Sequence, residues 1–300
     1  MIEVAAQRPI SFAQPGQPPV SQTLRTWREF KRNRLAVVGA AIVVLLYGLA
    51  VVAPTIAPHD YRAFNAGQPL KPPSAEHWFG TDRQTRDVFS RVLVASQVSL
   101  SVGLVAVVLI TSIGVSLGAL AGAVGGRTDE VIMRFTDIVL SIPQLFLLIA
   151  AAALFTPSLI TTMLVIGLTS WMSTARLVRG EFLRTRSLDF VTAAQALGAS
   201  TQRIILRHLL PNALAVIIVQ ATLWLSFAIL LESTLSFLGL GAQPPTPSWG
   251  GMLSDGRVDM QRAWWETVFP GMAIFITVLS FNLVGDGLRD ALDPRLRATR

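Results

Sequence analysis

Five strongly apolar stretches of this 300-residue chain contain no Asp, Glu, Lys or Arg, and each is at least 19 residues long. They are residues 35–58, 92–126, 138–175, 209–231 and 267–285. A helix needs about 20 apolar residues to cross a hydrocarbon core of about 30 Å. The third stretch has 38 residues, which is enough for two crossings joined by a turn near Pro157. We therefore predict an all-α integral membrane protein with six transmembrane helices.

The second stretch is read as one helix that starts near Ser99, with residues 92–98 as a lead-in at the surface. The predicted spans are residues 35–56, 99–122, 138–155, 159–175, 212–231 and 267–285. These spans divide the chain into an N-terminal tail (1–34) with a disordered start, a first span (35–56), an outer loop with the lead-in (57–98), a core domain (99–285) and a C-terminal tail (286–300).

Composition supports a membrane protein. Hydrophobic residues make up 52% of the chain and charged residues 14%, whereas soluble domains carry about 25% charged residues. The net charge of +7 is compatible with nucleic-acid binding, but the apolar content favours basic loops beside a membrane. We expect membrane lipid as a partner and no nucleic acid. The chain has no cysteine, which excludes disulfides and thiolate metal sites.

The distribution of Lys and Arg predicts the orientation. With six spans, one side of the membrane holds 18 of these residues and the other side holds 7. Because basic residues collect on the cytoplasmic side, both termini are predicted to be cytoplasmic. Trp249, Trp264 and Trp265 are then expected to anchor the chain at the outer interface. Residues 23–30 favour a short helix along the membrane surface, with Trp27 and Phe30 at the headgroups.

The longest charged inner loop, residues 176–211, is too long for a simple turn. Ser187 is a good N-cap, and Gly198 suits the position after the C-terminus of the helix that follows. Ser200 or Thr201 can cap a second helix over residues 202–209, which ends before Pro211. The first helix places Phe190, Ala194 and Leu197 on one face. This face can enter a groove on a soluble partner or lie on lipid headgroups.

The loop resembles the coupling loop of ABC-transporter permeases of the binding-protein-dependent importer class. The signature of that family is Glu-Ala-Ala, three residues, Gly, nine residues, Ile, one residue and Leu-Pro. The spacing fits throughout this chain, but Thr192 replaces the Glu and His208 replaces the Ile. The positions that the resemblance assigns to the ATPase-coupling loop are Phe190, Thr192, Ala193, Ala194, Leu197, Gly198, His208, Leu210 and Pro211.

Four further segments narrow the resemblance to the second permease subunit of the dipeptide/oligopeptide/nickel type. They are residues 77–93, 133–143, 231–253 and 281–297. The resemblance implies a type I importer permease fold in a bacterial inner membrane, and a non-catalytic subunit that forms half of a peptide pathway. The implied partners are a homologous second permease, two ATP-binding subunits that hold ATP and Mg²⁺, and a periplasmic or lipid-anchored solute-binding protein. Nickel, glutathione and other small solutes are alternative cargoes.

Two other classes of membrane protein are compatible with a chain of this hydrophobicity. An ion-coupled secondary transporter needs ionisable residues in the middle of its spans, and the predicted spans hold none there. A membrane-bound enzyme needs clustered acids, bases or metal ligands, but the chain has neither GxxxxGK[ST] nor HExxH, and no GxSxG nucleophile elbow is expected. His59 and His77 can be imagined in a nickel site, yet their spacing shows no ligand pattern. Glu232, at a span end, is expected in water at the interface, with binding of a cationic substrate group as the alternative.

Overall fold

A computed structural model describes residues 22–63 and 68–292. The predictions for residues 1–21 and 293–300 fall outside this part of the chain. Within it, the secondary structure is helical, with one isolated bridge between Thr81 and Asp87. The helices are α1 (Gln22–Arg32), α2 (Arg34–Ile56), α3 (Val88–Val124), α4 (Gly126–Leu140), α5 (Gln144–Ala153), α6 (Leu159–Thr169), α7 (Met172–Arg186), α8 (Asp189–Ala196), α9 (Thr201–Ile204), the π-helix η1 (Ile205–Leu209), α10 (Leu210–Phe237), α11 (Trp249–Gly256) and α12 (Trp265–Leu292).

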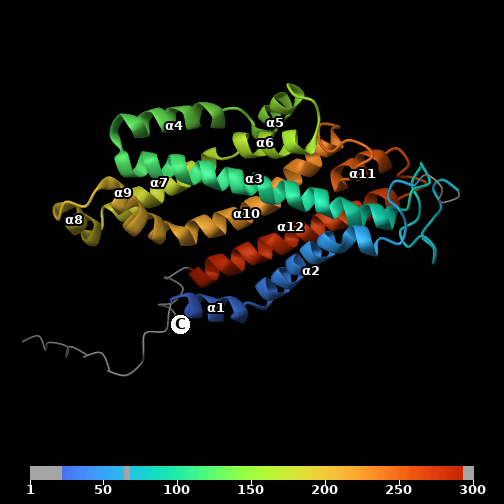
Figure 1. Ribbon diagram of the computed structural model, residues 1–300, viewed down its shortest axis with the longest axis horizontal. Coiled ribbons are helices and arrows are strands. Elements are labelled where there is room, and N and C mark those ends of the chain that lie inside the picture. Colours follow the sequence, from blue (N-terminus) through green and yellow to red (C-terminus); the bar gives the residue numbers. More distant parts are fainter. Residues whose placement is uncertain (1–21, 64–67, 293–300) are drawn as a thin grey trace, which may run out of the picture.

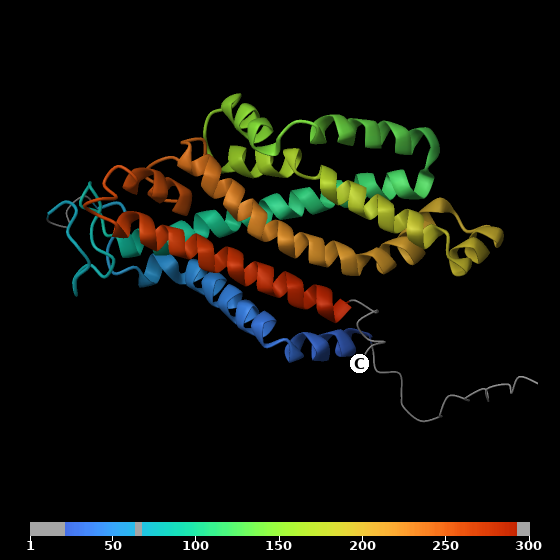
Figure 2. The ribbon, with the colours of Figure 1, turned by 180° about the vertical axis from the view of Figure 1, so that it is seen from behind.

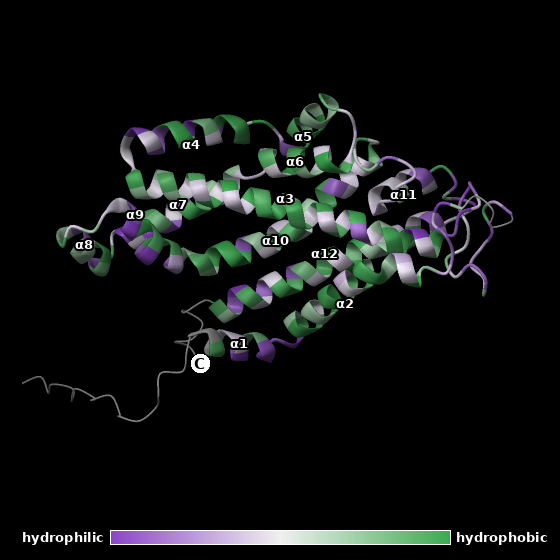
Figure 3. Ribbon diagram, viewed as in Figure 1, coloured by the Kyte–Doolittle hydropathy of each residue, from purple (hydrophilic) through white to green (hydrophobic). Residues whose placement is uncertain are grey.

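Four long helices, α2, α3, α10 and α12, run side by side along the long axis of the molecule (Figure 1). Hydrophilic residues gather at the two ends of this axis, with apolar helices between them (Figure 3). Among the described residues, four helical segments are long and apolar enough to cross a membrane, and the bent pair α4–α5 is a fifth candidate. The predicted all-α membrane class is therefore confirmed.

Helix α3 is the central element, because its residues enter three separate apolar clusters along its length. It begins eleven residues earlier than predicted. Asp87 caps it by accepting a hydrogen bond from the Ser90 amide at 2.8 Å, and Val94, Ala95 and Val98 are buried. The expected surface lead-in over residues 92–98 is therefore wrong. The charge-free stretch begins only after Arg91, so it did not reveal that the helix starts at Val88. Arg91 lies inside the helix and is buried.

The predicted spans 138–155 and 159–175 are not single straight helices. Helices α4 and α5 meet at an angle of 88° around residues 141–143. Pro143 accounts for the break, since proline lacks an amide donor and disfavours a helical residue before it. Helix α6 ends at Thr169, and α7 starts at Met172 and runs on to Arg186. The first eleven residues of the predicted charged loop thus belong to a helix.

Small residues let α3 and α7 approach closely. Gly114, Gly118 and Gly122 recur every four residues on α3 and face α7. A Cβ atom at Gly114 would lie 2.6 Å from the Thr174 Cβ, and one at Gly122 would lie 2.7 Å from the Phe182 Cβ. Such small-residue repeats are typical of tightly packed membrane helices.

Two tryptophans that were expected at the membrane interface are buried instead. The indole N–H of Trp249 donates to the Val92 carbonyl, and that of Trp265 donates to the Thr81 carbonyl, each at 3.1 Å. They therefore join the outer loops to the bundle, while Trp264 remains 49% exposed.

The predicted surface helix near the N-terminus is present as α1. Trp27 is exposed on it as expected, but Phe30 is buried against Ala36 and Ala291. The prediction for Phe30 is wrong because this contact ties α1 to the end of α12 rather than to lipid.

Candidate functional site

The most prominent projection from the bundle is a bent segment of residues 187–204, here called the elbow, which contains α8 and α9. It lies at one end of the long axis, and residues 57–63 and 68–87 lie at the other (Figures 1 and 2). The helix, glycine and helix expected from the sequence are all present. The bend occurs at Gly198, which has φ of +80°, a value that residues with a side chain rarely adopt.

The ends of the elbow helices are fixed by local hydrogen bonds. Ser200 caps α9 by accepting from the Arg203 amide at 3.4 Å, as predicted. Ser187 is not the N-cap of α8. That position is Leu188, which provides no side-chain cap, and the Ser187 hydroxyl instead donates to the Arg184 carbonyl at 2.9 Å. The backbone turns one residue later than predicted, so Ser187 closes α7.

The outward face of α8 carries most of the predicted coupling residues. Leu197 is 89% exposed and Phe190 is 45% exposed, while Ala194 is half-buried. Thr192 and Ala193 are also exposed. Leu197 and Phe190 thus leave apolar surface uncovered on the elbow.

The residue that holds α8 on the bundle is Val191, which the sequence reasoning missed. It is fully buried and packs in a cluster with Val178, Phe182, Ile204 and Leu209. The run from Phe190 to Leu197 is rich in apolar residues on more than one face. The period alone therefore did not tell which face was inward.

The second elbow helix was predicted to end before Pro211, and this prediction is wrong. Residues 201–237 form one continuous helix that contains a π-turn at residues 205–209. The Leu210 amide bonds to the Ile205 carbonyl. Proline cannot supply the usual donor, and the wider turn accommodates it. His208 is half-buried, and its carbonyl accepts a hydrogen bond from the Asn212 side chain at 2.6 Å.

The arginines around the elbow fall into two groups. Those on α7 are engaged: Arg179 binds Asp129 of α4 through two hydrogen bonds, and Arg186 donates to the Ala123 carbonyl at 3.1 Å. Arg203 and Arg207 on the second arm are exposed and form no ion pair within the described residues. The second arm of the elbow therefore carries two exposed positive charges.

The opposite end of the molecule holds a buried ion-pair network that sequence patterns did not reveal. Asp82 bonds the Arg86 Nε at 2.6 Å and lies 3.7 Å from the Arg91 Nε. In the same region, Arg83 grips Asp259, 176 residues further along, through two hydrogen bonds of 2.7 Å. The hydrogen bond from Arg83 and its charge hold the pKa of Asp259 below the usual range. This network fastens the outer loops together.

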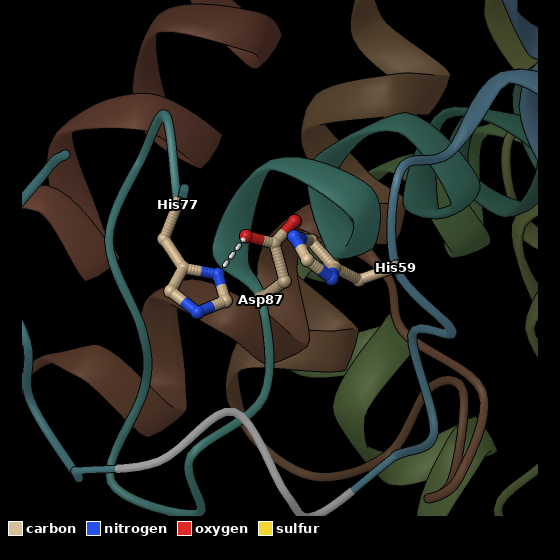
Figure 4. A group of neighbouring side chains, drawn as sticks. All are labelled: His59, His77 and Asp87. Atoms are coloured by element: carbon tan, nitrogen blue, oxygen red, sulfur yellow. Dashed lines mark hydrogen bonds and ion pairs between the residues drawn. The ribbon is translucent and has the colours of Figure 1, made fainter. Parts of the chain in front are cut away.

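Three possible metal ligands meet in the outer loop, as Figure 4 shows. His59, His77 and Asp87 bring ligand atoms within 4.8 Å of one another. One nitrogen of each imidazole already has a protein partner: His77 Nδ1 bonds Asp87 at 2.9 Å, and His59 Nε2 bonds the Glu76 carbonyl at 3.1 Å, while His77 Nε2 is buried without a partner among the described residues. The residue types can hold a metal ion, but these contacts give the group a structural role, which is to tie the loop to the start of α3. Asp87 was not foreseen, because it lies ten residues beyond His77.

Glu232 does not lie in water as expected, since it is fully buried. Its carboxylate accepts from the Ser236 hydroxyl at 2.7 Å and lies 3.4 Å from that of Ser233. It is therefore not placed to bind a cationic substrate group. Burial was not predictable, because the sequence alone does not show which side of α10 faces the bundle.

One serine has the spacing of a hydrolase nucleophile, GxSxG, at residues 114–118. It lies inside α3 rather than on a sharp turn, and the Ser116 hydroxyl donates to the Ser112 carbonyl at 2.7 Å. The geometry therefore does not support acyl-transfer chemistry at this position.

A bundle of apolar helices with an exposed, bent elbow at one end defines a multi-pass helical membrane protein. Residues 114–298 match the family described as binding-protein-dependent transport system inner membrane component. Residues 21–73 match the N-terminal transmembrane domain of oligopeptide transport permease C. The chain belongs to this family of ABC importer permeases, which places it in the inner membrane as a multi-pass protein and implies an ATPase and a binding protein as partners.

Several curated relatives are similar over nearly their whole length. The dipeptide transport system permease protein DppC of Alkalihalophilus pseudofirmus is 43% identical over 97% of this chain and 98% of its own. The oligopeptide transport system permease protein OppC of Bacillus subtilis is 42% identical over 92% of each chain. The glutathione transport system permease protein GsiD of Escherichia coli is 44% identical over 90% of each chain.

Proposed function

We propose that this chain is one of two permease subunits in an ATP-driven importer of dipeptides or oligopeptides. Relatives named for dipeptide and oligopeptide transport support this cargo, and the glutathione relative supports glutathione, itself a small peptide, as the alternative. The second subunit is a homologous permease. Two ATPase subunits bind ATP and Mg²⁺ on the cytoplasmic side, and a periplasmic or lipid-anchored protein delivers the cargo.

The proposed topology has six crossings, made by α2, α3, α4–α5, α6–α7, α10 and α12. Helix α1 and the end of α12 pack together and lie toward the same end of the bundle as the elbow (Figure 1). Both termini are then cytoplasmic, in agreement with the excess of Lys and Arg on that side.

The observation that carries the proposal is the exposed elbow. Leu197 and Phe190 enter a groove on an ATPase subunit, Thr192, Ala193 and Ala194 line the contact, and Gly198 sets the bend. His208, Leu210 and Pro211 lie where the second arm joins α10, so movement of the elbow reaches the bundle directly. Closure of the ATPases on ATP then tilts the helices and switches the pathway between its inward and outward openings.

Gly198→Val tests the proposal. A β-branched residue resists the φ of +80° that the bend requires, so we expect a variant that inserts and assembles but no longer couples ATP hydrolysis to uptake. Gly239→Val is the matched control, because Gly239 also has φ of +80° and open space around it but lies beyond the far end of α10. Wild-type uptake by Gly198→Val, or equal loss in both variants, would overturn the role of the elbow.

A further inference from the structure

We propose that a cavity at mid-depth in the bundle is half of a binding site for the amide backbone of a peptide in transit. The inference rests on the proposed peptide import and adds the residues that contact the cargo. The cavity has a volume of about 330 Å³ and lies where α4, α5, α6, α7 and α10 come together. This volume is at the lower end of the range for ligand pockets, as expected of a half-site.

The depth of the cavity follows from helix lengths. The pair α4–α5, the pair α6–α7 and helix α10 each cover 28 residues. Ile142, Ser170 and Trp224 line the cavity, and each lies near the middle of its run. Two of the three runs are broken there. At membrane depth, backbone that leaves the helix is stable only where it is covered by protein or lines a cavity, so both breaks point to this space.

The cavity offers hydrogen-bonding groups that the protein does not use. The Gln220 amide and the Ser173 hydroxyl line it, and neither forms a side-chain hydrogen bond within the described residues. The Gln144 side-chain amide donates one hydrogen bond to the Ser170 hydroxyl at 3.1 Å, and the side-chain carbonyl oxygen of Gln144 stays free. Unpaired polar groups in an apolar region cost free energy until a partner arrives.

These groups select for neutral amides. Carboxamide and hydroxyl groups both donate and accept hydrogen bonds, which matches the N–H and C=O groups of a peptide bond. The lining contains no charged side chain. Arg176 and Asp137, which lie a few residues beyond the lining of α7 and α4, bond each other at 2.5 Å. Peptides of different side chains and net charge share the same backbone, so such a site tolerates varied cargo.

The open side of the cavity faces away from this chain. Leu140, Ile142 and Phe227 line it and are each more than 40% exposed. An apolar rim around a polar centre suits coverage by the second permease, which would supply the opposite half of the site.

Cysteine labelling tests the inference cleanly, because this chain has no cysteine of its own. The complete transporter, with its partner subunits, is reconstituted in liposomes carrying Gln220→Cys or Ser173→Cys, with the unchanged chain as background. A charged, membrane-impermeant methanethiosulfonate is the probe. Val44→Cys is the control, since Val44 lies in the middle of α2 and is 72% exposed on the bundle surface.

We expect labelling at both cavity positions, slowed severalfold by the loaded binding protein with excess dipeptide, and no labelling at Val44. Gln220→Leu should raise the half-saturating cargo concentration on the order of fivefold, the effect of one lost hydrogen bond. Gln220→Asn keeps the amide group and should raise this concentration less. Labelling of the cavity positions as low as at Val44 would indicate that lipid or the partner fills the cavity, and it overturns the inference. A labelling rate that cargo does not change also overturns it. If the unaltered transporter shows no uptake and no ATPase stimulation with dipeptide, the proposed function itself fails.

Discussion

A Cβ atom on Gly118 would overlap the backbone carbonyl oxygen of Ala175, so α3 and α7 touch backbone to backbone at this point. The contact matters because α7 leads directly into the elbow, while α3 is the central helix of the bundle. A displacement of the elbow therefore acts first on a closely packed helix pair.

Gly118→Leu should separate this pair. Backbone atoms cannot yield as a flexible side chain can, and overpacking a well-packed site costs about 1–3 kcal/mol or more. We expect a lower melting temperature of the purified complex and a loss of assembled transporter. Gly48→Leu is the control, since nothing lies within 4 Å of a Cβ at Gly48. Equal melting temperatures of the two variants would contradict the close contact.

Leu197→Asp should abolish coupling without unfolding the permease. The side chain is 89% exposed in this chain, so folding loses little, but a charge in an apolar groove of the ATPase is costly. The measurement is ATPase activity stimulated by the loaded binding protein, together with the yield of ATPase that co-purifies. Gln195→Asp places the same charge on the same helix, and we expect it to retain most activity. A fully active Leu197→Asp would show that the groove lies elsewhere.

Asp82→Asn should destabilise the outer end. It leaves the buried Arg86 and Arg91 without their nearest charge partner, and breaking a buried ion pair costs about 3–5 kcal/mol. The control is Glu76→Gln, because Glu76 pairs with Lys71 on the surface and exposed pairs contribute at most about 1 kcal/mol. Thermal unfolding of both variants distinguishes the two cases, and a similar shift for both would argue against a buried network.

The link between Arg83 and Asp259 should be sensitive to acid. Because the pKa of Asp259 is lowered in the folded chain, the carboxylate stabilises the fold above its unfolded pKa of about 3.9, and this contribution is lost as the pH falls through the folded value. We expect proteolysis of the outer loops to rise below about pH 4. Arg83→Gln should show the faster cleavage already at neutral pH, with a smaller further change on acidification. Identical pH profiles would exclude the link as the cause.

Part of this architecture could be predicted from single residues and their spacing. Stretches without charge located α2, α10 and α12, and the positive φ of Gly198 agrees with its place after a short helix. The predictions that failed concerned the direction in which the chain runs or a side chain points. A charge-free run does not show that the chain turns by 88° near Pro143.

Other features depend on residues far apart in sequence. Val191 faces inward because Phe182 and Ile204 are there to receive it. Arg83 meets a carboxylate that lies 176 residues away. Glu232 is buried because of how α10 packs. To predict any of these three features, one would need to know which parts of the chain are neighbours in space. No local sequence pattern contains that information.

The uninterrupted helix from Thr201 to Phe237 has 37 residues, a length of about 55 Å at 1.5 Å per residue. Beyond the π-turn at residues 205–209, the helix hardly shortens, so a tilt at one end is carried to the other. In the proposed importer, whatever tilts the tip beside the elbow also swings the opposite tip, at the end proposed to face the cargo-delivery protein. Nucleotide binding by the ATPases of this importer can thus move the opposite end of the transporter through a single helix. No relay of side-chain rearrangements between the two ends is needed.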